Sequence, residues 1–380
     1  MISGSAIEGR AHSGEQRPPS GDLPFLWPLA LVGQATQNRL ALTERNLRFA
    51  AEASRLRAPP APGFPTPNRV ILKLRTLWLR DYSCSTGEGE PAIVIAPYAG
   101  HTATVADYQR DQSLVGVLLA NGVGRVVLTD WRSATADMKD FDIDQYLAEL
   151  NVCVDDVGGR VKLIGLCQGG WLGAMYAARF PAKVAKLVLA GAPIDTDAGD
   201  GPVKRMAHAY SMALYERLVA AGGGLMRGDV MLAGWKGMHP VDHALRKHAE
   251  LYRRLDEPEF LRRTEAFASW YETTLDLPGR WYLQVIRQIF KENRLAKGRF
   301  VGLGRRLHLR DVTCPAYLLA GEADDVTTAE QVFNAELLLG TPGPAIEKRL
   351  VPGGHIGLFM GSKSLTGVWP EIARWLASET

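Results

Sequence analysis

The chain of 380 residues carries 44 Lys and Arg against 41 Asp and Glu, a formal net charge of +3, and 46% of its residues are hydrophobic. This composition is that of a globular protein with a large core, and the near balance of charge gives no basis for binding nucleic acid. The four cysteines form no CxxC pair and have no zinc-binding spacing, which argues against a disulfide framework or a metal site and favours a reducing cytoplasm.

The first part of the chain has the composition of a tail followed by a linker. Residues 1–22 are rich in Gly, Ser, Pro and charge and lack the apolar core of a secretory signal, so we expect a disordered tail. Residues 23–68 begin with a helical pattern and end in a stretch with five prolines, which is typical of a semi-rigid linker. No apolar run reaches the length of a transmembrane segment.

Short apolar runs alternate with helical patterns from residue 69 onward. This alternation predicts an α/β fold with a mostly parallel sheet and helices on both faces. The alternation stops over residues 203–299, where helical patterns predominate, so we predict a core of residues 69–202 and 300–380 with an inserted helical cap at 203–299. Strands are expected at residues 70–79, 92–96, 125–129, 161–166, 185–189, 316–320 and 346–351, and helices at 105–121, 143–157, 168–179 and 365–378.

The most informative motif is Gly-Leu-Cys-Gln-Gly at residues 165–169. It matches the nucleophile elbow G-x-S-x-G of the α/β-hydrolase fold, with Cys167 in place of serine, and it has the required strand before it and helix after it. Glycines are needed because the turn is sharp, and the N-terminus of a helix favours a thiolate. The alternative interpretation is a buried structural cysteine in a Gly-rich turn.

A nucleophile of this kind needs a histidine and an acid, which follow in the chain order acid, then histidine. His355 comes after the strand at 346–351, and Asp324 comes after the strand at 316–320. Both positions are loops at the carboxyl ends of parallel strands, where such sheets carry their sites. We predict His355 as the base and Asp324 as its partner, with Asp325 and Asp195 as alternatives for the acid.

Two backbone amides should form an oxyanion hole. The amide of Gln168 follows the nucleophile directly, and the second amide should come from the turn after the strand at 92–96, where Tyr98 is preferred and Ala99 is the alternative. We also expect Trp131 and Trp171 to contact the substrate.

From residue 92 to the C-terminus the chain resembles the intracellular polyhydroxyalkanoate depolymerases and their relatives, the polyhydroxyalkanoate synthases. Both families have an α/β-hydrolase fold and a cysteine nucleophile. Asp324–Asp325 favours the depolymerases, since synthases usually carry an Asp-His pair there, whereas Gly169–Gly170 favours the synthases. Further depolymerase-like stretches are residues 96–104, 128–131, 191–195, 282–290 and 354–361, and further synthase-like stretches are 131–132 and 292–295.

The resemblance implies hydrolysis of an intracellular poly(3-hydroxyalkanoate), such as poly(3-hydroxybutyrate), through a hydroxyacyl thioester on Cys167. It implies no cofactor, a cytoplasmic location and an association with polyester granules. The alternatives are a synthase-like acyltransferase that uses 3-hydroxyacyl-coenzyme A, a granule-associated protein without catalysis, and a small-molecule esterase or thioesterase.

The predicted cap is rich in aromatic residues. They either line a channel for a hydrophobic polyester or pack the interior of the cap, and the sequence favours packing for any single one of them. The residues concerned are Tyr210, Tyr215, Trp235, Trp270, Tyr271, Trp281 and Tyr282.

Overall fold

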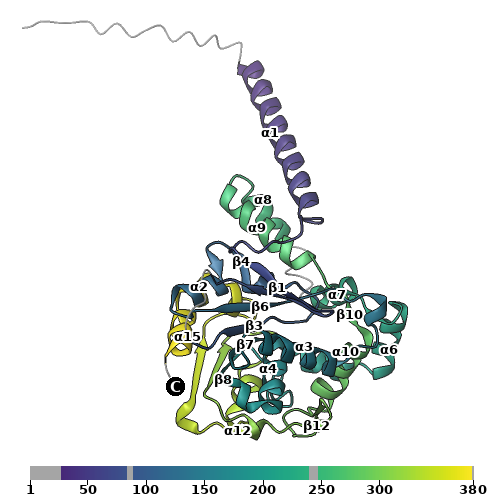
Figure 1. Ribbon diagram of the computed structural model, residues 1–380. Coiled ribbons are helices and arrows are strands. Elements are labelled where there is room, and N and C mark those ends of the chain that lie inside the picture. Colours follow the sequence, from purple (N-terminus) through teal and green to yellow (C-terminus); the bar gives the residue numbers. More distant parts are fainter. Residues whose placement is uncertain (1–26, 84–88, 239–246, 379–380) are drawn as a thin grey trace, which may run out of the picture. The chain divides into compact units, whose positions relative to one another are not determined.

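The computed structural model describes residues 27–83, 89–238 and 247–378 (Figure 1). The predicted tail at residues 1–22 lies outside this part of the chain. The chain divides into two units, residues 1–52 and 53–380, and the remainder of the description concerns the second unit. Helix α1 (Trp27–Arg55) confirms the helical pattern at the start of the chain. No helix among the described residues is long and apolar enough to cross a membrane.

Within the described residues, one sheet of eight strands forms the centre of the second unit. The first two strands in the sheet order run antiparallel to their neighbours, and every other pair is parallel, which confirms a mostly parallel sheet. In spatial order the strands are β1 (Arg69–Lys73), β2 (Leu77–Asp81), β6 (Val126–Trp131), β3 (Ala92–Ile95), β7 (Val161–Leu166), β8 (Val184–Ala190), β13 (Ala316–Gly321) and β14 (Ile346–Val351).

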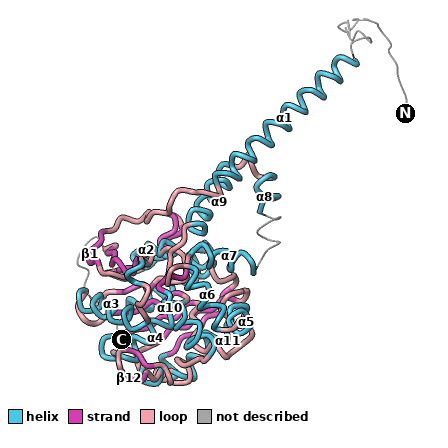
Figure 2. The backbone as a smooth tube through the Cα atoms, turned by 90° about the vertical axis from the view of Figure 1, so that its right-hand side faces the viewer, coloured by secondary structure: helices cyan, strands magenta, loops and turns pink. Residues whose placement is uncertain are grey.

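The central strands are apolar and buried because helices cover the sheet on both sides (Figure 2). Every residue of β3, β8 and β13 is buried, as expected for strands covered on both faces. Helix α2 packs against α15, and α3 packs against α4. The helices next to the sheet are α2 (Leu114–Ala120), α3 (Ile143–Asp156), α4 (Gln168–Arg179) and α15 (Val368–Ala377).

Two predicted elements near the start of the core are wrong. Residues 70–79 form two strands, β1 and β2, because the chain turns back between them, where the amide of Leu74 donates to the carbonyl of Leu77 at 2.8 Å. Residues 105–121 form an α-helix only in α2, and residues 105 and 106 end a short 3-10 helix. Their first part contains a short hairpin whose buried Asp107 accepts a hydrogen bond from Ser113, so these polar groups are satisfied outside a helix.

The segment between β8 and β13 is mainly helical and contains two small two-stranded ribbons, β9–β10 and β11–β12. The domain boundaries predicted for it remain a prediction. Its elements are α5 (Pro202–Ala209), α6 (Met212–Ala221), β9 (Leu225–Met226), α7 (Gly228–Met238), α8 (Lys247–Arg253), α9 (Pro258–Glu272), β10 (Leu277–Pro278), α10 (Gly279–Gln284), the π-helix η5 (Val285–Lys291), β11 (Val301–Gly302) and β12 (Arg305–Arg306).

The remaining short elements connect the strands and close the chain. The predicted helix at 365–378 is divided into two helices, α14 and α15, which meet at Gly367. These short elements are η1 (Ala103–Ala106), β4 (Asp107–Gln109), β5 (Gln112–Ser113), η2 (Ala136–Met138), η3 (Pro181–Lys183), η6 (Leu309–Asp311), α11 (Ala329–Phe333), α12 (Ala335–Leu338), η7 (Gly343–Ala345), α13 (Gly357–Met360) and α14 (Ser362–Thr366).

A buried carboxylate ties α3 to the turn between β1 and β2, and its removal should destabilise the fold. Glu149 accepts hydrogen bonds from the amide and the hydroxyl of Thr76, at 2.9 and 2.6 Å. Because Glu149→Ala leaves both donors buried and unpaired, we expect a loss of about 2–3 kcal/mol in the free energy of unfolding, measured by urea denaturation. The control Glu216→Ala removes an exposed ion pair with Arg287 and should cost at most about 0.5 kcal/mol. Equal effects of the two substitutions would contradict this expectation.

Candidate active site

Cys167 lies at the sharp turn between β7 and α4, as predicted. Its backbone is in an unusual conformation for a residue with a side chain, with φ 50° and ψ −116°. The amide of Cys167 donates to the carbonyl of Ala190 at 2.8 Å, which anchors the turn to the neighbouring strand β8. Strained backbone of this kind persists only where the surrounding structure holds it in place.

Close backbone packing explains the glycines of the elbow. A Cβ atom on Gly169 would lie 2.0 Å from the carbonyl oxygen of Ile95, and one on Gly165 would lie 2.3 Å from the Cα atom of Gly170. A Cβ atom on Gly170 would lie 2.2 Å from the Cβ atom of Ala192. Each glycine therefore allows a contact that no other residue permits, and the paired Gly169–Gly170 is a packing requirement of this elbow.

The imidazole of His355 is buried between the cysteine and a carboxylate. Its Nδ1 atom lies 2.8 Å from Oδ2 of Asp324, and His355 is 5% exposed. Burial lowers the pKa of His355, but interactions with Cys167 and Asp324 raise this pKa well above its ordinary value. The fold thus brings the three residues of the predicted triad into one cluster, with the imidazole in the middle.

Asp324 is held in place by the loop that follows β13. Its Oδ1 atom accepts hydrogen bonds from the amides of Val326 and Thr327, at 2.9 and 2.8 Å, which leaves Oδ2 for His355. Its side chain is 1% exposed. The sequence does not predict these two hydrogen bonds, because a backbone amide is present at almost every residue and leaves no signature in the residue types.

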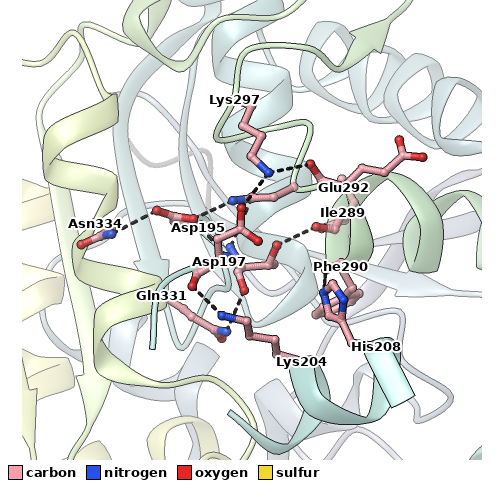
Figure 3. Close-up of polar contacts among 12 residues, drawn as sticks. Asp195, Asp197, Lys204, His208, Ile289, Phe290, Glu292, Lys297, Gln331 and Asn334 are labelled. Carbon is pink, nitrogen blue, oxygen red and sulfur yellow. Dashed lines mark hydrogen bonds and ion pairs between the residues drawn. The ribbon is translucent and has the colours of Figure 1, made fainter. Parts of the chain in front are cut away.

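The two alternative acids lie elsewhere. Asp195 belongs to a separate polar network (Figure 3), in which it accepts hydrogen bonds from Asn293 at 2.7 Å and from Asn334 at 3.0 Å. Asp325 is exposed. Among the three candidates, Asp324 is the one with a hydrogen bond to His355.

The turn after β3 lies beside the first turn of α4. The contact between Gly169 and Ile95 brings the end of β3 against the residue that follows Gln168. Gln168 is the first residue of α4, so its amide has no acceptor within the helix. Tyr98 is fixed by its hydroxyl, which is 3.1 Å from the carbonyl of Arg132 and 3.2 Å from that of Asp276. The assignment of the amides of Gln168 and Tyr98 as an oxyanion hole stays a prediction.

Both predicted substrate-binding tryptophans are buried. Trp131 is 2% exposed, and its indole donates to the carbonyl of Ala96 at 2.7 Å, so it supports the turn after β3. Trp171 has no exposed surface. Neither side chain is accessible in this structure, and their contact with substrate stays a prediction. In the inserted segment between β8 and β13, the side chains of Tyr215, Trp270 and Trp281 are buried, whereas Tyr210 is half exposed.

The comparisons with known proteins agree with this fold. The family model described as "Protein of unknown function (DUF3141)" matches residues 70–337. The chain is similar to "Poly(3-hydroxyalkanoate) polymerase subunit PhaC" of Haloferax mediterranei, at 27% identity over 83% of this chain and 64% of that protein. It is also similar to the protein of the same name from Allochromatium vinosum, at 26% identity over 82% of this chain and 88% of that protein.

A solved structure shares the fold. The monoacylglycerol lipase of Paleococcus ferrophilus matches 80% of this chain and 99% of its own, with a TM-score of 0.50 and 15% identity. The α/β-hydrolase fold is thereby confirmed. The curated relatives are named polymerase subunits, which supports the synthase side of the family resemblance and gives no support to the depolymerase side.

The elbow yields a sharp prediction. Gly169→Ala would place a Cβ atom within 2.0 Å of the Ile95 carbonyl oxygen, so β3 and α4 would have to separate. We expect this variant to lose about 3 kcal/mol of stability, measured by urea unfolding. The control Gly234→Ala lies in α7, where nothing is within 4 Å of an added Cβ atom, and it should be neutral or stabilising. Equal stability of the two variants would contradict the packing argument.

The buried imidazole predicts a particular pH dependence. Because the pKa of His355 is raised on folding, its protonated form contributes stability that is complete below the unfolded pKa of about 6.5 and is lost as the pH rises through the folded pKa. Asp324→Asn keeps an acceptor for the two amides but removes the charge that supports the imidazolium. We expect this variant to be about 1–2 kcal/mol less stable than wild type near pH 6, with a difference that shrinks at alkaline pH.

Urea unfolding of the two proteins from about pH 6 to pH 10 measures this difference. The matched control is Asp195→Asn, whose carboxylate is bonded to side-chain amides and not to a histidine. Its effect should be independent of pH over this range. A difference in the free energy of unfolding between wild type and Asp324→Asn that stays constant or grows with pH would rule out a stabilising interaction between Asp324 and the protonated His355.

Proposed function

We propose, from the premise that the chain belongs to the DUF3141 family, that it is an acyltransferase with a cysteine nucleophile that moves 3-hydroxyacyl groups from coenzyme A thioesters to a polyester chain. One observation carries this proposal. The buried imidazole of His355 interacts with Cys167, and its Nδ1 atom is hydrogen-bonded to the carboxylate of Asp324 at 2.8 Å. The polymerase names of the relatives support the choice of substrate.

The proposed reaction has two halves that use the same groups. His355 takes the proton of the Cys167 thiol, and the thiolate attacks the thioester carbonyl. The amides of Gln168 and Tyr98 bind the oxyanion of the tetrahedral intermediate. The carbon–sulfur bond to coenzyme A then breaks, and coenzyme A leaves as a thiol after it receives the proton from His355.

The second half transfers the acyl group from the enzyme. A hydroxyl group at the end of the polyester loses its proton to His355 and attacks the thioester on Cys167. The new ester bond forms as the bond to the cysteine sulfur breaks, and the proton returns to that sulfur. Throughout the cycle Asp324 holds the tautomer of His355 and stabilises its charged form.

Hydrolysis of the polyester is the second candidate function. It uses the same acyl-enzyme, and differs only in the group that attacks the thioester, which is water in place of the polymer hydroxyl. The motif at Asp324–Asp325 favours this candidate, because synthases usually carry an Asp-His pair at that place.

The release of coenzyme A tests the proposal. Wild-type protein incubated with 3-hydroxybutyryl-coenzyme A should release a free thiol, detected with a thiol reagent, and Cys167→Ala should reduce the rate at least about 1,000-fold. The control Cys314→Ala changes a cysteine near the start of β13 and should leave the rate close to that of wild type.

Incubation with amorphous poly(3-hydroxybutyrate) granules distinguishes the candidates. An acyltransferase releases thiol and lengthens the polyester, whereas a hydrolase releases 3-hydroxybutyrate or short oligomers. Absence of thiol release from wild-type protein would reject acyl transfer, and absence of both products would support a granule protein without catalysis.

A further inference from the structure

Two buried tryptophans beside the elbow lack hydrogen-bond acceptors. Among the described residues, Trp131, Trp270 and Trp369 each donate their indole N–H to a backbone carbonyl. Trp171 and Trp281 are as deeply buried, at 0% and 2% exposure, but their Nε1 atoms have no partner within the described chain. An unpaired buried donor of this kind costs about 1–3 kcal/mol, so two of them side by side require an explanation.

The two indoles are neighbours. Their ring centroids are 6.1 Å apart, and the Trp281 ring lies 5.1 Å from the ring of Tyr98, in the turn after β3. Trp171 lies in the first turn of α4, which begins directly after Cys167. Both unpaired donors therefore belong to the surroundings of the candidate nucleophile.

An unpaired acceptor lies on the same helix face. The Oε1 atom of Gln168 is buried and has no partner among the described residues. Gln168 and Trp171 are three residues apart, so their side chains are neighbours on the surface of α4. The site thus combines two buried N–H donors that lack an acceptor with one buried acceptor that lacks a donor.

We propose that Trp171, Trp281 and Gln168 form a subsite for the 3-hydroxyl group of an acyl chain bound at Cys167, an inference that rests on the proposed function. A hydroxyl has two lone pairs and one proton, so it accepts from both indoles and donates to the Gln168 oxygen. A carbonyl oxygen at the same position would leave Gln168 unpaired, and an unsubstituted acyl chain would leave all three groups unpaired.

The place of these residues along the chain agrees with this assignment. In a 3-hydroxyacyl thioester the hydroxyl oxygen is four bonds from the cysteine sulfur, a reach of roughly 4–5 Å for bonds of about 1.5 Å. A group that binds this hydroxyl must therefore lie close to Cys167, and Gln168 and Trp171 belong to the first turn of α4, directly after it. Trp171 belongs to the core helix and Trp281 to α10 of the inserted segment, so the two parts of the fold together define the subsite.

Binding of two acyl-coenzyme A compounds to the full chain with Cys167→Ala tests the subsite without turnover. We expect 3-hydroxybutyryl-coenzyme A to bind about 5- to 10-fold more tightly than butyryl-coenzyme A, measured by isothermal titration calorimetry, because only the former pairs the buried groups. When Trp171→Phe or Trp281→Phe is added, the two compounds should bind with nearly equal affinity, since phenylalanine keeps a ring but removes the N–H group.

Trp369→Phe in the same background is the matched control, because Trp369 is a buried indole that donates to the carbonyl of Leu358. It should lower the melting temperature and leave the hydroxyl preference intact. Equal affinities for the two compounds in the Cys167→Ala chain, no binding of either, or a preference that survives both Trp→Phe changes would overturn the proposal. The comparison of the two ligands needs no tryptophan variant, so equal affinities would reject the subsite even where those variants fail to fold.

The subsite and the proposed function fail in different ways. Thiol release by wild-type protein without a hydroxyl preference in binding would leave acyl transfer standing and reject the subsite. A hydroxyl preference without thiol release would support the subsite and reject acyl transfer.

Discussion

The contact between the first turn of α4 and the end of β3 determines where the reactive sulfur lies. Gly169 brings its Cα atom against the Ile95 carbonyl oxygen, and this approach leaves no room for a side chain. Cys167 has a positive φ at this turn, and its amide donates to the carbonyl of Ala190 in β8. The close approach of α4 to β3 and the bond to β8 together hold the nucleophile at the end of the sheet, next to the turn that follows β3.

Electrostatics within a buried cluster then set the state of the histidine. Burial alone would remove the proton from His355, because a charge in a low-dielectric interior is costly. Interactions with Cys167 and Asp324 outweigh this effect and raise the pKa of His355 well above its ordinary value. Asp324 in turn is oriented by two amides of its own loop. The arrangement has the chemistry of an activated nucleophile, and it is the ground for proposing acyl transfer.

The inserted segment completes the surroundings of the site. Trp281 reaches Tyr98 from α10, and Tyr98 also bonds to the carbonyl of Asp276 in the same segment. These contacts enclose the aromatic cluster next to Cys167, which is 7% exposed. The environment that receives the acyl chain is therefore built jointly by the core and the inserted segment, and the unpaired indoles lie at the junction between them.

The sequence by itself determined the alternation of strands and helices, the elbow at Cys167 and the candidates His355 and Asp324. These features depend on local periodicity, on glycine spacing and on the position of a residue just after a strand, all of which involve residues close together in the chain. It failed where long-range contacts outweighed the local pattern. Asp107 accepts hydrogen bonds from Ser113 across the β4–β5 hairpin and from the distant Thr66, so the predicted helix at 105–121 is shortened. Only the tertiary structure separated Asp324 from Asp195, since both follow a strand and only their partners differ. The tertiary structure was also needed to distinguish Trp131, whose indole N–H donates to the carbonyl of Ala96, from Trp171 and Trp281, whose indole N–H groups have no acceptor among the described residues. The acceptor of a buried donor comes from a distant part of the chain, so the sequence does not reveal it.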